Sequence, residues 1–234
     1  MMTTTHPRQG RPRHTPPSKP GTSAREQILD AAGALFVERG IAATSTRMIA
    51  ERVGIRQASL YYHFATKDDI LAELLATSVR PSLEMVKRIQ ALSPEQTNAA
   101  AALYALAVMD VRTLSSTPYN IGTLYLLPEV QAEQFDTFRQ ERGRLLQSYG
   151  TLGTLAATED VARGLPSQRI GELLIQLVEV VIQMRRSRAP EEADTDTIAS
   201  SCLRLCGLGE PAVTAAREEA RILLNRLTDT APHD

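Results

Sequence analysis

The segment from residue 45 to residue 64, STRMIAERVGIRQASLYYHF, constrains the fold more than any other part of the chain. Apolar side chains recur at helical spacing in two short runs, which are joined by the tight connection GIR. The apolar residues that would hold these two helices at a fixed angle are Ile49, Val53, Ile55 and Leu60. Two short helices joined by a glycine-containing turn form a helix-turn-helix. The segment therefore predicts this motif, packed against the helix that precedes it.

The rest of the chain also predicts helices and contains no convincing strand or internal repeat. A capping box, Ser23 with Glu26 three residues later, predicts the start of the first helix, and Gly40 predicts its end. Thr66 and the acidic residues after it predict the start of a fourth helix, which we expect to bend at Pro81. An irregular segment is expected between the fifth and sixth helices. The predicted helices span residues 23–40, 44–54, 57–63, 66–92, 94–115, 131–156, 167–187, 195–208 and 211–228.

Charge is distributed unevenly along the chain. Residues 1–67 carry 10 Lys and Arg against 4 Asp and Glu, whereas residues 68–234 carry 16 against 23. A basic first third predicts that an anionic partner such as nucleic acid meets the N-terminal end. A chance fluctuation in composition is the alternative on charge alone.

The first 22 residues hold five prolines and four Arg or Lys, but no Ile, Leu, Val or Phe. Such a segment cannot bury enough apolar surface to offset its ordering entropy, so we expect a disordered tail. The basic residues could follow a DNA backbone, or the tail could be solvated without a function. These residues are Arg8, Arg11, Arg13 and Lys19.

Composition argues against several other classes of protein. No stretch of 18 apolar residues predicts a membrane span, and no apolar region after the basic N-terminus predicts a secretory signal. Two cysteines, Cys202 and Cys206, are too few for a disulfide framework and suit the cytoplasm as buried thiols. No phosphate-binding loop, metal-ligand spacing or serine elbow is present, so we expect no enzyme activity, cofactor or metal site. The four histidines are His6, His14, His63 and His233.

The outward face of the helix-turn-helix is rich in polar and aromatic side chains. We expect Gln57, at the start of the second helix, to reach base edges in the major groove, while Ser59 allows close approach. Tyrosine hydroxyls, His63 and Lys67 suit phosphate oxygens, which position a protein without reading sequence. The alternative is a helical bundle in which this aromatic segment is ordinary core.

Residues 35–71 resemble the DNA-binding domain of the tetracycline-repressor-like (TetR) regulators. The residues that carry the resemblance are Phe36, Gly40, Thr44, Thr46, Ile49, Ala50, Gly54, Ala58, Leu60, Tyr61, His63, Phe64, Lys67 and Leu71. The DNA contacts that it implies are Thr44, Thr46, Arg47, Gln57, Ser59, Tyr61, Tyr62, His63 and Lys67. Arg56 departs from the pattern, since the family most often has a capping Ser or Thr there; we count it as a further DNA contact.

The resemblance also implies a domain organisation. A tail of residues 1–22 and a three-helix DNA-binding domain of residues 23–67 should precede a larger helical effector-binding and dimerisation domain of residues 68–234. Candidate residues for an effector pocket are Met85, Tyr104, Met109, Asp110, Arg112, Tyr119, Asn120, Tyr125, Phe135, Phe138 and Arg142. Each of these, taken singly, could equally be core or surface.

The segment IGELLIQLVEVVIQMRR, residues 170–186, predicts a dimer helix because apolar residues wrap most of its circumference. One face would pack on its own domain and another on a partner chain. The candidate interface residues on this helix and the next are Leu174, Leu177, Val178, Val181, Leu203 and Leu205. A polar stripe should be solvated or hydrogen-bonded across the dimer, with a pocket wall as the alternative; it comprises Glu172, Gln176, Glu179 and Gln183.

These observations predict an all-α protein that regulates transcription. The function expected from the resemblance is a repressor that binds a palindromic double-stranded DNA operator as a homodimer and is released by a small-molecule effector. The alternative is a ligand-independent or architectural DNA-binding protein, which would bind without sequence preference and with a steep dependence on salt.

Overall fold

The computed structural model describes residues 22–92 and 98–229, and within these ranges every regular element is helical, as the sequence predicts. The predicted disorder of the N-terminal tail falls outside the described residues, apart from residue 22. The α-helices are α1 (Ala24–Arg39), α2 (Thr46–Val53), α3 (Gln57–His63), α4 (Lys67–Thr77), α5 (Arg80–Gln90), α6 (Ala99–Ser116), α7 (Asp136–Ala156), α8 (Glu159–Gly164), α9 (Ser167–Met184), α10 (Glu192–Leu205) and α11 (Glu210–Asp229). Three 3-10 turns are η1 (Ile121–Leu124), η2 (Pro128–Gln131) and η3 (Glu133–Phe135). No helix in this part of the chain is both long enough and apolar enough to span a membrane.

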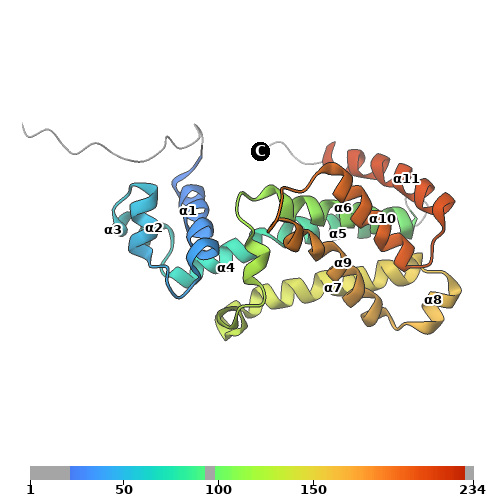
Figure 1. Ribbon diagram of the computed structural model, residues 1–234, viewed down its shortest axis with the longest axis horizontal. Helices are drawn as coiled ribbons and strands as arrows, with labels where there is room; N and C mark the ends of the chain where they lie inside the picture. The colour runs from blue at the N-terminus through green and yellow to red at the C-terminus, as the bar shows by residue number, and fades with distance from the viewer. Residues whose placement is uncertain (1–21, 93–97, 230–234) are drawn as a thin grey trace, which may run out of the picture.

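Helices α1 to α3 form a small unit at one end of the molecule, and α4 runs from it into the larger body (Figure 1). Ser23 and Glu26 make the predicted capping box at the start of α1. Gly54 ends α2 with φ of 80°, a conformation that favours glycine and turns the chain toward α3. Leu60 is fully buried against this unit, so the remaining faces of α3 are free to carry polar residues.

The predicted fourth helix is two helices, and the predicted bend at Pro81 is wrong. α4 ends at Thr77, and α5 begins at Arg80 with Pro81 in its first turn. A proline is accommodated there because the first amide groups of a helix have no intrahelical acceptor. The break lies at Ser78, whose hydroxyl donates to the carbonyl of Leu75 at 2.5 Å and accepts from the hydroxyl of Tyr125 at 2.6 Å.

Other helix boundaries differ by a few residues from those predicted. α10 begins and ends three residues earlier than predicted. At its start, Glu191 and Asp194 form a capping box, which fixes the first turn. α7 begins at Asp136 rather than at residue 131, since the preceding residues form η2 and η3. The short helix α8 lies in a segment for which the sequence predicts no helix; none of its residues is buried, so it lacks an apolar repeat.

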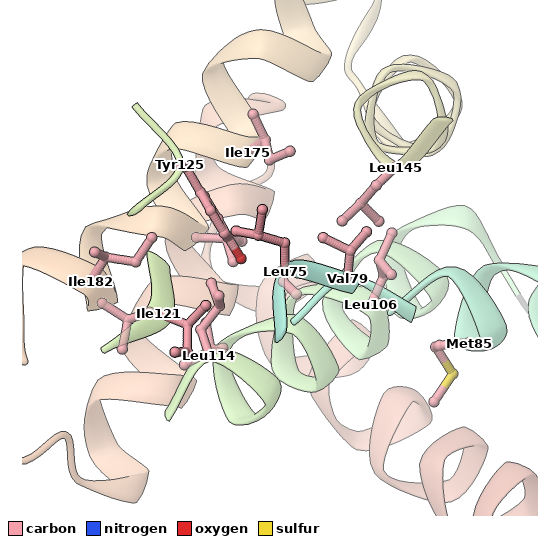
Figure 2. Packing of buried hydrophobic residues seen from close by; sticks show 14 of the residues in the cluster. Leu75, Val79, Met85, Leu106, Leu114, Ile121, Tyr125, Leu145, Ile175 and Ile182 are labelled. Atoms are coloured by element: carbon pink, nitrogen blue, oxygen red, sulfur yellow. The ribbon is translucent and has the colours of Figure 1, made fainter. Parts of the chain in front are cut away.

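The core of the larger body surrounds α6, which packs against α5, α7, α9, α10 and α11. Figure 2 shows side chains from several of these helices meeting, among them Leu106 of α6, Leu145 of α7 and Ile175 of α9. Cys202 and Cys206 are also buried, and burial raises the pKa of the Cys202 thiol to about 12. These thiols are therefore small core side chains and stay protonated at neutral pH.

Helices α7 and α9 are in close backbone contact at two glycines. A Cβ atom on Gly171 of α9 would lie 2.6 Å from the carbonyl oxygen of Leu146 and 2.9 Å from the backbone nitrogen of Gly150, both on α7. A Cβ atom on Gly150 would in turn lie 2.6 Å from the carbonyl oxygen of Ser167. Only hydrogen atoms at these positions allow the two backbones to touch.

Residues 117–124, which run from the end of α6 through η1, connect the larger body to the N-terminal unit. Arg185, at the end of α9, donates hydrogen bonds to the carbonyls of Leu114 and Thr117, and Asn120 donates to the carbonyl of Ile182 at 2.7 Å. On the other side of the segment, Tyr119 and Ile121 pack against α1 at Gly33, where an added Cβ would lie 3.2 Å from each side chain. The N-terminal unit is thus held by this segment as well as by α4.

Candidate DNA-binding surface and effector groove

Helix α3 presents an open polar face to the outside. Tyr62 is 88% exposed and Tyr61 is 48% exposed, whereas the preceding residue, Leu60, is fully buried. Gln57 and Ser59 are also exposed, as the helical spacing predicts. The rings of Tyr61 and Tyr62 are therefore not core, although that of Phe64, directly after α3, is buried. The alternative of a bundle in which this whole aromatic segment is ordinary core is wrong.

Three residues of this surface hydrogen-bond to one another. The amide nitrogen of Gln57 donates to the hydroxyl of Thr46 at 3.0 Å and to the hydroxyl of Tyr61 at 3.3 Å. The two hydroxyl oxygens lie 3.1 Å apart, so one of them donates to the other. We call these residues the Thr46–Gln57–Tyr61 triangle; it joins the start of α2 to α3.

Two predicted DNA contacts turn inward. Thr44 is 2% exposed, and its hydroxyl lies 2.8 Å from the carbonyl of Gly40 and 3.2 Å from that of Leu35, so the prediction that this side chain contacts DNA is wrong. The ammonium group of Lys67 donates to the carbonyls of Ile41 and Thr44 at 2.7 and 2.9 Å. Lys67 therefore fixes the connection between α1 and α2, with one ammonium proton left for a phosphate.

Replacing Lys67 with Met should destabilise the N-terminal unit by about 2 kcal/mol, because two carbonyls lose a charged donor. DNA affinity should fall to a similar degree for every sequence, since the Thr44 region would no longer be anchored. Thermal unfolding and DNA titration of the variant measure the two effects. Arg47→Met is the matched control for stability, because Arg47 is exposed and, among the residues that the structure describes, its ion pair is with Glu51 on its own helix. An unfolding temperature for Lys67→Met equal to that of the control would contradict the anchoring role.

The remaining predicted contacts border the exposed face. His63 is half-buried, and its ring meets that of Tyr62 edge-on at 5.4 Å between centroids. Arg47 and Arg56 are exposed, and Arg56 makes no side-chain cap to α3, as its departure from the usual Ser or Thr implies. Together with the triangle these side chains form a surface that offers donors and acceptors to a nucleic acid.

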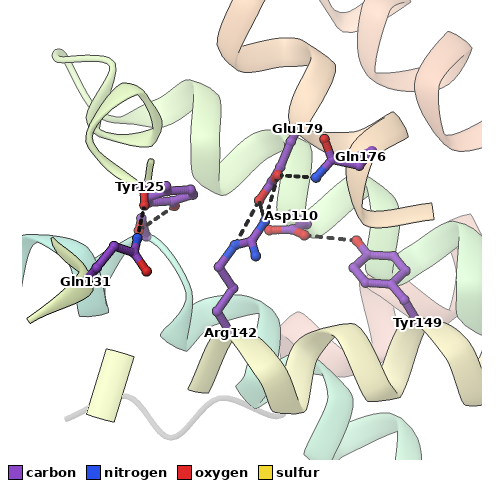
Figure 3. Close-up of polar contacts among 8 residues, drawn as sticks. Asp110, Tyr125, Gln131, Arg142, Tyr149, Gln176 and Glu179 are labelled. Atoms are coloured by element: carbon purple, nitrogen blue, oxygen red, sulfur yellow. Dashed lines mark hydrogen bonds and ion pairs between the residues drawn. The ribbon is translucent and has the colours of Figure 1, made fainter. Parts of the chain in front are cut away.

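A groove of about 880 Å³ lies between residues 120–126, α7 and α9, next to Val37 of α1. Its polar wall is an ion pair in which Arg142 contacts both carboxylate oxygens of Glu179, at 2.6 and 2.8 Å, and Gln176 donates to the same carboxylate (Figure 3). Gln183 also lines it. Most of the polar stripe of α9 thus lines a groove, because Arg142 lies opposite it. This is the pocket wall that the sequence offers as the alternative.

The candidate pocket residues do not meet in one site. Asn120, Tyr125 and Arg142 line the groove. Two others face α10: the hydroxyl of Tyr104 donates to Asp196, and Arg112 pairs with Glu192. The rest lie in the core, in another cleft or beside α1; they are Met85, Met109, Asp110, Tyr119, Phe135 and Phe138. The candidates are therefore spread over several places, and the groove combines three of them with Gln176, Glu179 and Gln183 of the polar stripe, for which a pocket wall was the alternative.

Asp110 is a buried carboxylate at the centre of α6. It accepts hydrogen bonds from the hydroxyl of Ser82 on α5 and from that of Tyr149 on α7, both at 2.9 Å. Burial raises the pKa of Asp110 to about 6, more than these two hydrogen bonds lower it. Figure 3 shows Asp110 beside the Arg142–Glu179 pair, whose charges have opposite effects on it. The site therefore ties three helices together with a carboxyl group that titrates close to neutral pH.

Four of the six predicted dimer-interface residues are buried within the chain's own core. These are Leu174, Val178, Val181 and Leu203, each 0% exposed, and the prediction that they contact a partner is wrong. Helix α9 packs on α6 and α7, and α10 packs on α6 and α9, which the sequence could not reveal. Leu177 and Leu205 are partly exposed. On the outer face of α9 the exposed or half-exposed apolar residues recur at spacings of 4, 3 and 4: Leu173, Leu177, Val180 and Met184.

Comparisons with known proteins agree with this geometry. Residues 28–74 match the family model described as bacterial regulatory proteins, tetR family. The HTH-type transcriptional repressor KstR2 of Mycobacterium tuberculosis (strain ATCC 25618 / H37Rv) is 49% identical over 53 residues, which cover 23% of this chain and 26% of that protein. The chain thus matches only about a quarter of the length of the first curated relatives.

Solved structures match over much more of the chain. Mycobacterium smegmatis AmtR is 41% identical, with a TM-score of 0.76, over 89% of this chain and 98% of that one. The structure of AibR in complex with isovaleryl coenzyme A and operator DNA has a TM-score of 0.61 at 16% identity, over 76% and 97% of the two chains, and shows the fold alone. The helix-turn-helix matches the family model, and the likeness to AmtR covers nearly the full length of both chains. The chain therefore belongs to the tetR family of bacterial regulatory proteins.

Proposed function

We propose that this chain is a transcriptional repressor in the cytoplasm, which binds a palindromic DNA operator as a homodimer and is released by a small-molecule effector. The observation that carries the proposal is the exposed face of α3, where Gln57, Ser59, Tyr61 and Tyr62 are open to a major groove while Leu60 fixes the helix to its support. The curated relative KstR2 is named a repressor, and AibR was solved with an operator.

Recovery of genomic fragments bound by the purified full chain tests this proposal. We expect fragments that share an inverted repeat whose half-sites lie about one duplex turn apart. Titrations at several salt concentrations should then separate the specific affinity from the sequence-independent one. Binding of all fragments alike, with a steep salt dependence and no shared repeat, would instead support an architectural DNA-binding protein. The genes beside the repeat would suggest candidate effectors.

The outer apolar stripe of α9 is the proposed dimer surface. Leu173 and Val180 are 39% and 40% exposed, although both are apolar and lie on a helix whose opposite face is core. A helix with apolar residues on two sides is stabilised when both are buried. Two copies of α9, with Leu205 of α10 contributing, would cover these side chains and place two α3 helices on one duplex.

A charge in this stripe should separate the protomers. Val180→Lys is expected to yield a monomer and to weaken operator binding by at least about 100-fold, because one half-site alone gives too small an interface. Analytical ultracentrifugation and DNA titration measure the two effects. Ile222→Lys is the matched control, since Ile222 is a 58% exposed apolar residue on α11. A monomer from the control variant and a dimer from Val180→Lys would place the interface on α11 instead.

The proposed effector site is the groove beside residues 120–126. Its walls come from α9, from α7 and from the segment that touches α1, so a bound molecule would contact both the dimer helix and the support of the N-terminal unit. An effector that binds better when α1 is displaced would lower operator affinity by shifting the population of conformations. Arg142→Met should abolish the response to such an effector while the basal operator affinity is retained. A full response in this variant would move the site elsewhere.

A further inference from the structure

The Thr46–Gln57–Tyr61 triangle restricts what Gln57 can offer to DNA. A glutamine amide has two donor protons on Nε2 and one acceptor oxygen, Oε1. In the structure both Nε2 contacts, to Thr46 and to Tyr61, lie within the protein surface. The Oε1 atom makes no hydrogen bond in the described part of the chain, and Gln57 is exposed. The side chain is thus held with its acceptor free.

This arrangement differs from that of a freely rotating glutamine. A free glutamine side chain pairs with adenine through two bonds, accepting from N6 and donating to N7. Gln57 would have to break its bonds to Thr46 and Tyr61 before its nitrogen could donate to N7. The triangle also fixes the rotamer of Gln57 before DNA binds. Binding in this rotamer therefore costs less side-chain entropy than binding in any other.

We infer that Gln57 reads a base that carries an exocyclic amino group in the major groove, adenine or cytosine, by accepting through Oε1, and that Thr46 and Tyr61 set this preference. Only adenine N6 and cytosine N4 offer a donor there, whereas guanine and thymine present acceptors at the corresponding positions. An acceptor facing an acceptor leaves both without a partner, so guanine and thymine are disfavoured. The inference rests on the proposed function, since it specifies what the exposed face of α3 recognises.

The triangle leaves one donor for the DNA backbone. Its three contacts use both amide protons and one of the two hydroxyl protons, because Thr46 and Tyr61 share a single bond. The other hydroxyl proton is not needed within the triangle and suits a phosphate oxygen. Loss of either hydroxyl should therefore lower affinity for all sequences as well as change base preference, and the two effects must be measured separately.

The test compares all four bases at the operator position that Gln57 contacts. This position is the one at which Gln57→Ala loses discrimination between bases. For the parent chain we expect similar affinities for adenine and cytosine, both about 10-fold tighter than for guanine or thymine. In the double variant Thr46→Val with Tyr61→Phe the amide is free, so adenine should become about 10-fold tighter than cytosine through its two bonds.

Tyr62→Phe is the matched control, because it removes an exposed tyrosine hydroxyl next to the triangle without breaking it. It should leave the ranking of the four bases unchanged, even if affinity falls for all of them. A parent chain that prefers guanine or thymine at this position, or a double variant with the parent's ranking, would overturn the inference while leaving sequence-specific binding intact. Absence of any sequence-specific binding by the parent would overturn the proposed function itself.

Discussion

Replacing Gly171 with alanine is expected to destabilise the protein by about 3 kcal/mol. The added Cβ would lie 2.6 Å from the carbonyl oxygen of Leu146 and 2.9 Å from the backbone nitrogen of Gly150. Neither atom belongs to a flexible side chain, so α7 and α9 would have to move apart. The free energy of unfolding, measured by urea denaturation, gives the size of the effect.

Gly143→Ala, on the facing helix α7, is the control. A Cβ atom there would meet no atom within 4 Å, and the residue is exposed. Alanine has the higher helix propensity and reduces the freedom of the unfolded chain, so this variant should gain about 0.5–1 kcal/mol. The two substitutions thus make the same chemical change with opposite signs. Stabilisation by both would mean that α7 and α9 tolerate a wider separation than their backbone contact indicates.

The second large effect concerns pH. Burial raises the pKa of Asp110 from 3.8 to about 6, so the folded state holds a proton that the unfolded state has lost. The stability that this carboxyl group contributes is fully present below about pH 4 and is lost as pH rises through about 6. The loss amounts to about 3 kcal/mol. Asp110→Asn removes this titrating group. As the pH is raised from 4 to 7, the unfolding free energy of the variant minus that of the parent should therefore increase by about 3 kcal/mol.

A second substitution tests the cause of the effect. Tyr149→Phe keeps the ring in place but removes a hydroxyl that donates to Asp110 and lowers the pKa of its carboxyl group. The descending part of the stability curve should therefore shift to higher pH. The charges that face Asp110 from other helices are Arg142 of α7 and Glu179 of α9, and they act in opposite directions. Identical pH profiles for the parent and Asp110→Asn would show that Asp110 is not the titrating group.

The helix-turn-helix could be predicted from sequence because its signals are local. The predicted span of α3, Gln57–His63, equals the observed one, since a glycine turn precedes it and apolar spacing marks its buried side. The break between α4 and α5 could not be predicted in the same way. Ser78 is held there by Tyr125, 47 positions away. The nearby Pro81 indicates a bend, but it does not indicate that α4 already ends at Thr77.

In the larger body, the spacing of apolar residues predicts helices but does not indicate which side of a helix faces the core. The spacing of α9 correctly indicates apolar residues on two sides, but it does not tell which side faces the protomer's own core. Leu174 is buried and Leu173 is exposed, although the two residues are identical neighbours. The groove was only partly predicted for a similar reason, because Arg142 and Glu179 are 37 positions apart and pair only in the folded chain.

The attachment of the N-terminal unit at two places, through α4 and through residues 117–124, has a consequence for the operator. Hydrogen bonds of Arg185 and Asn120 hold that segment to α9, and Tyr119 and Ile121 of the segment pack against α1. A DNA-binding unit that is held at two places resists rotation toward a half-site that has moved. One extra base pair between the half-sites turns the second of them by about 35° around the duplex. If the chain binds such an operator as proposed, its affinity for a site with this extra base pair should therefore fall.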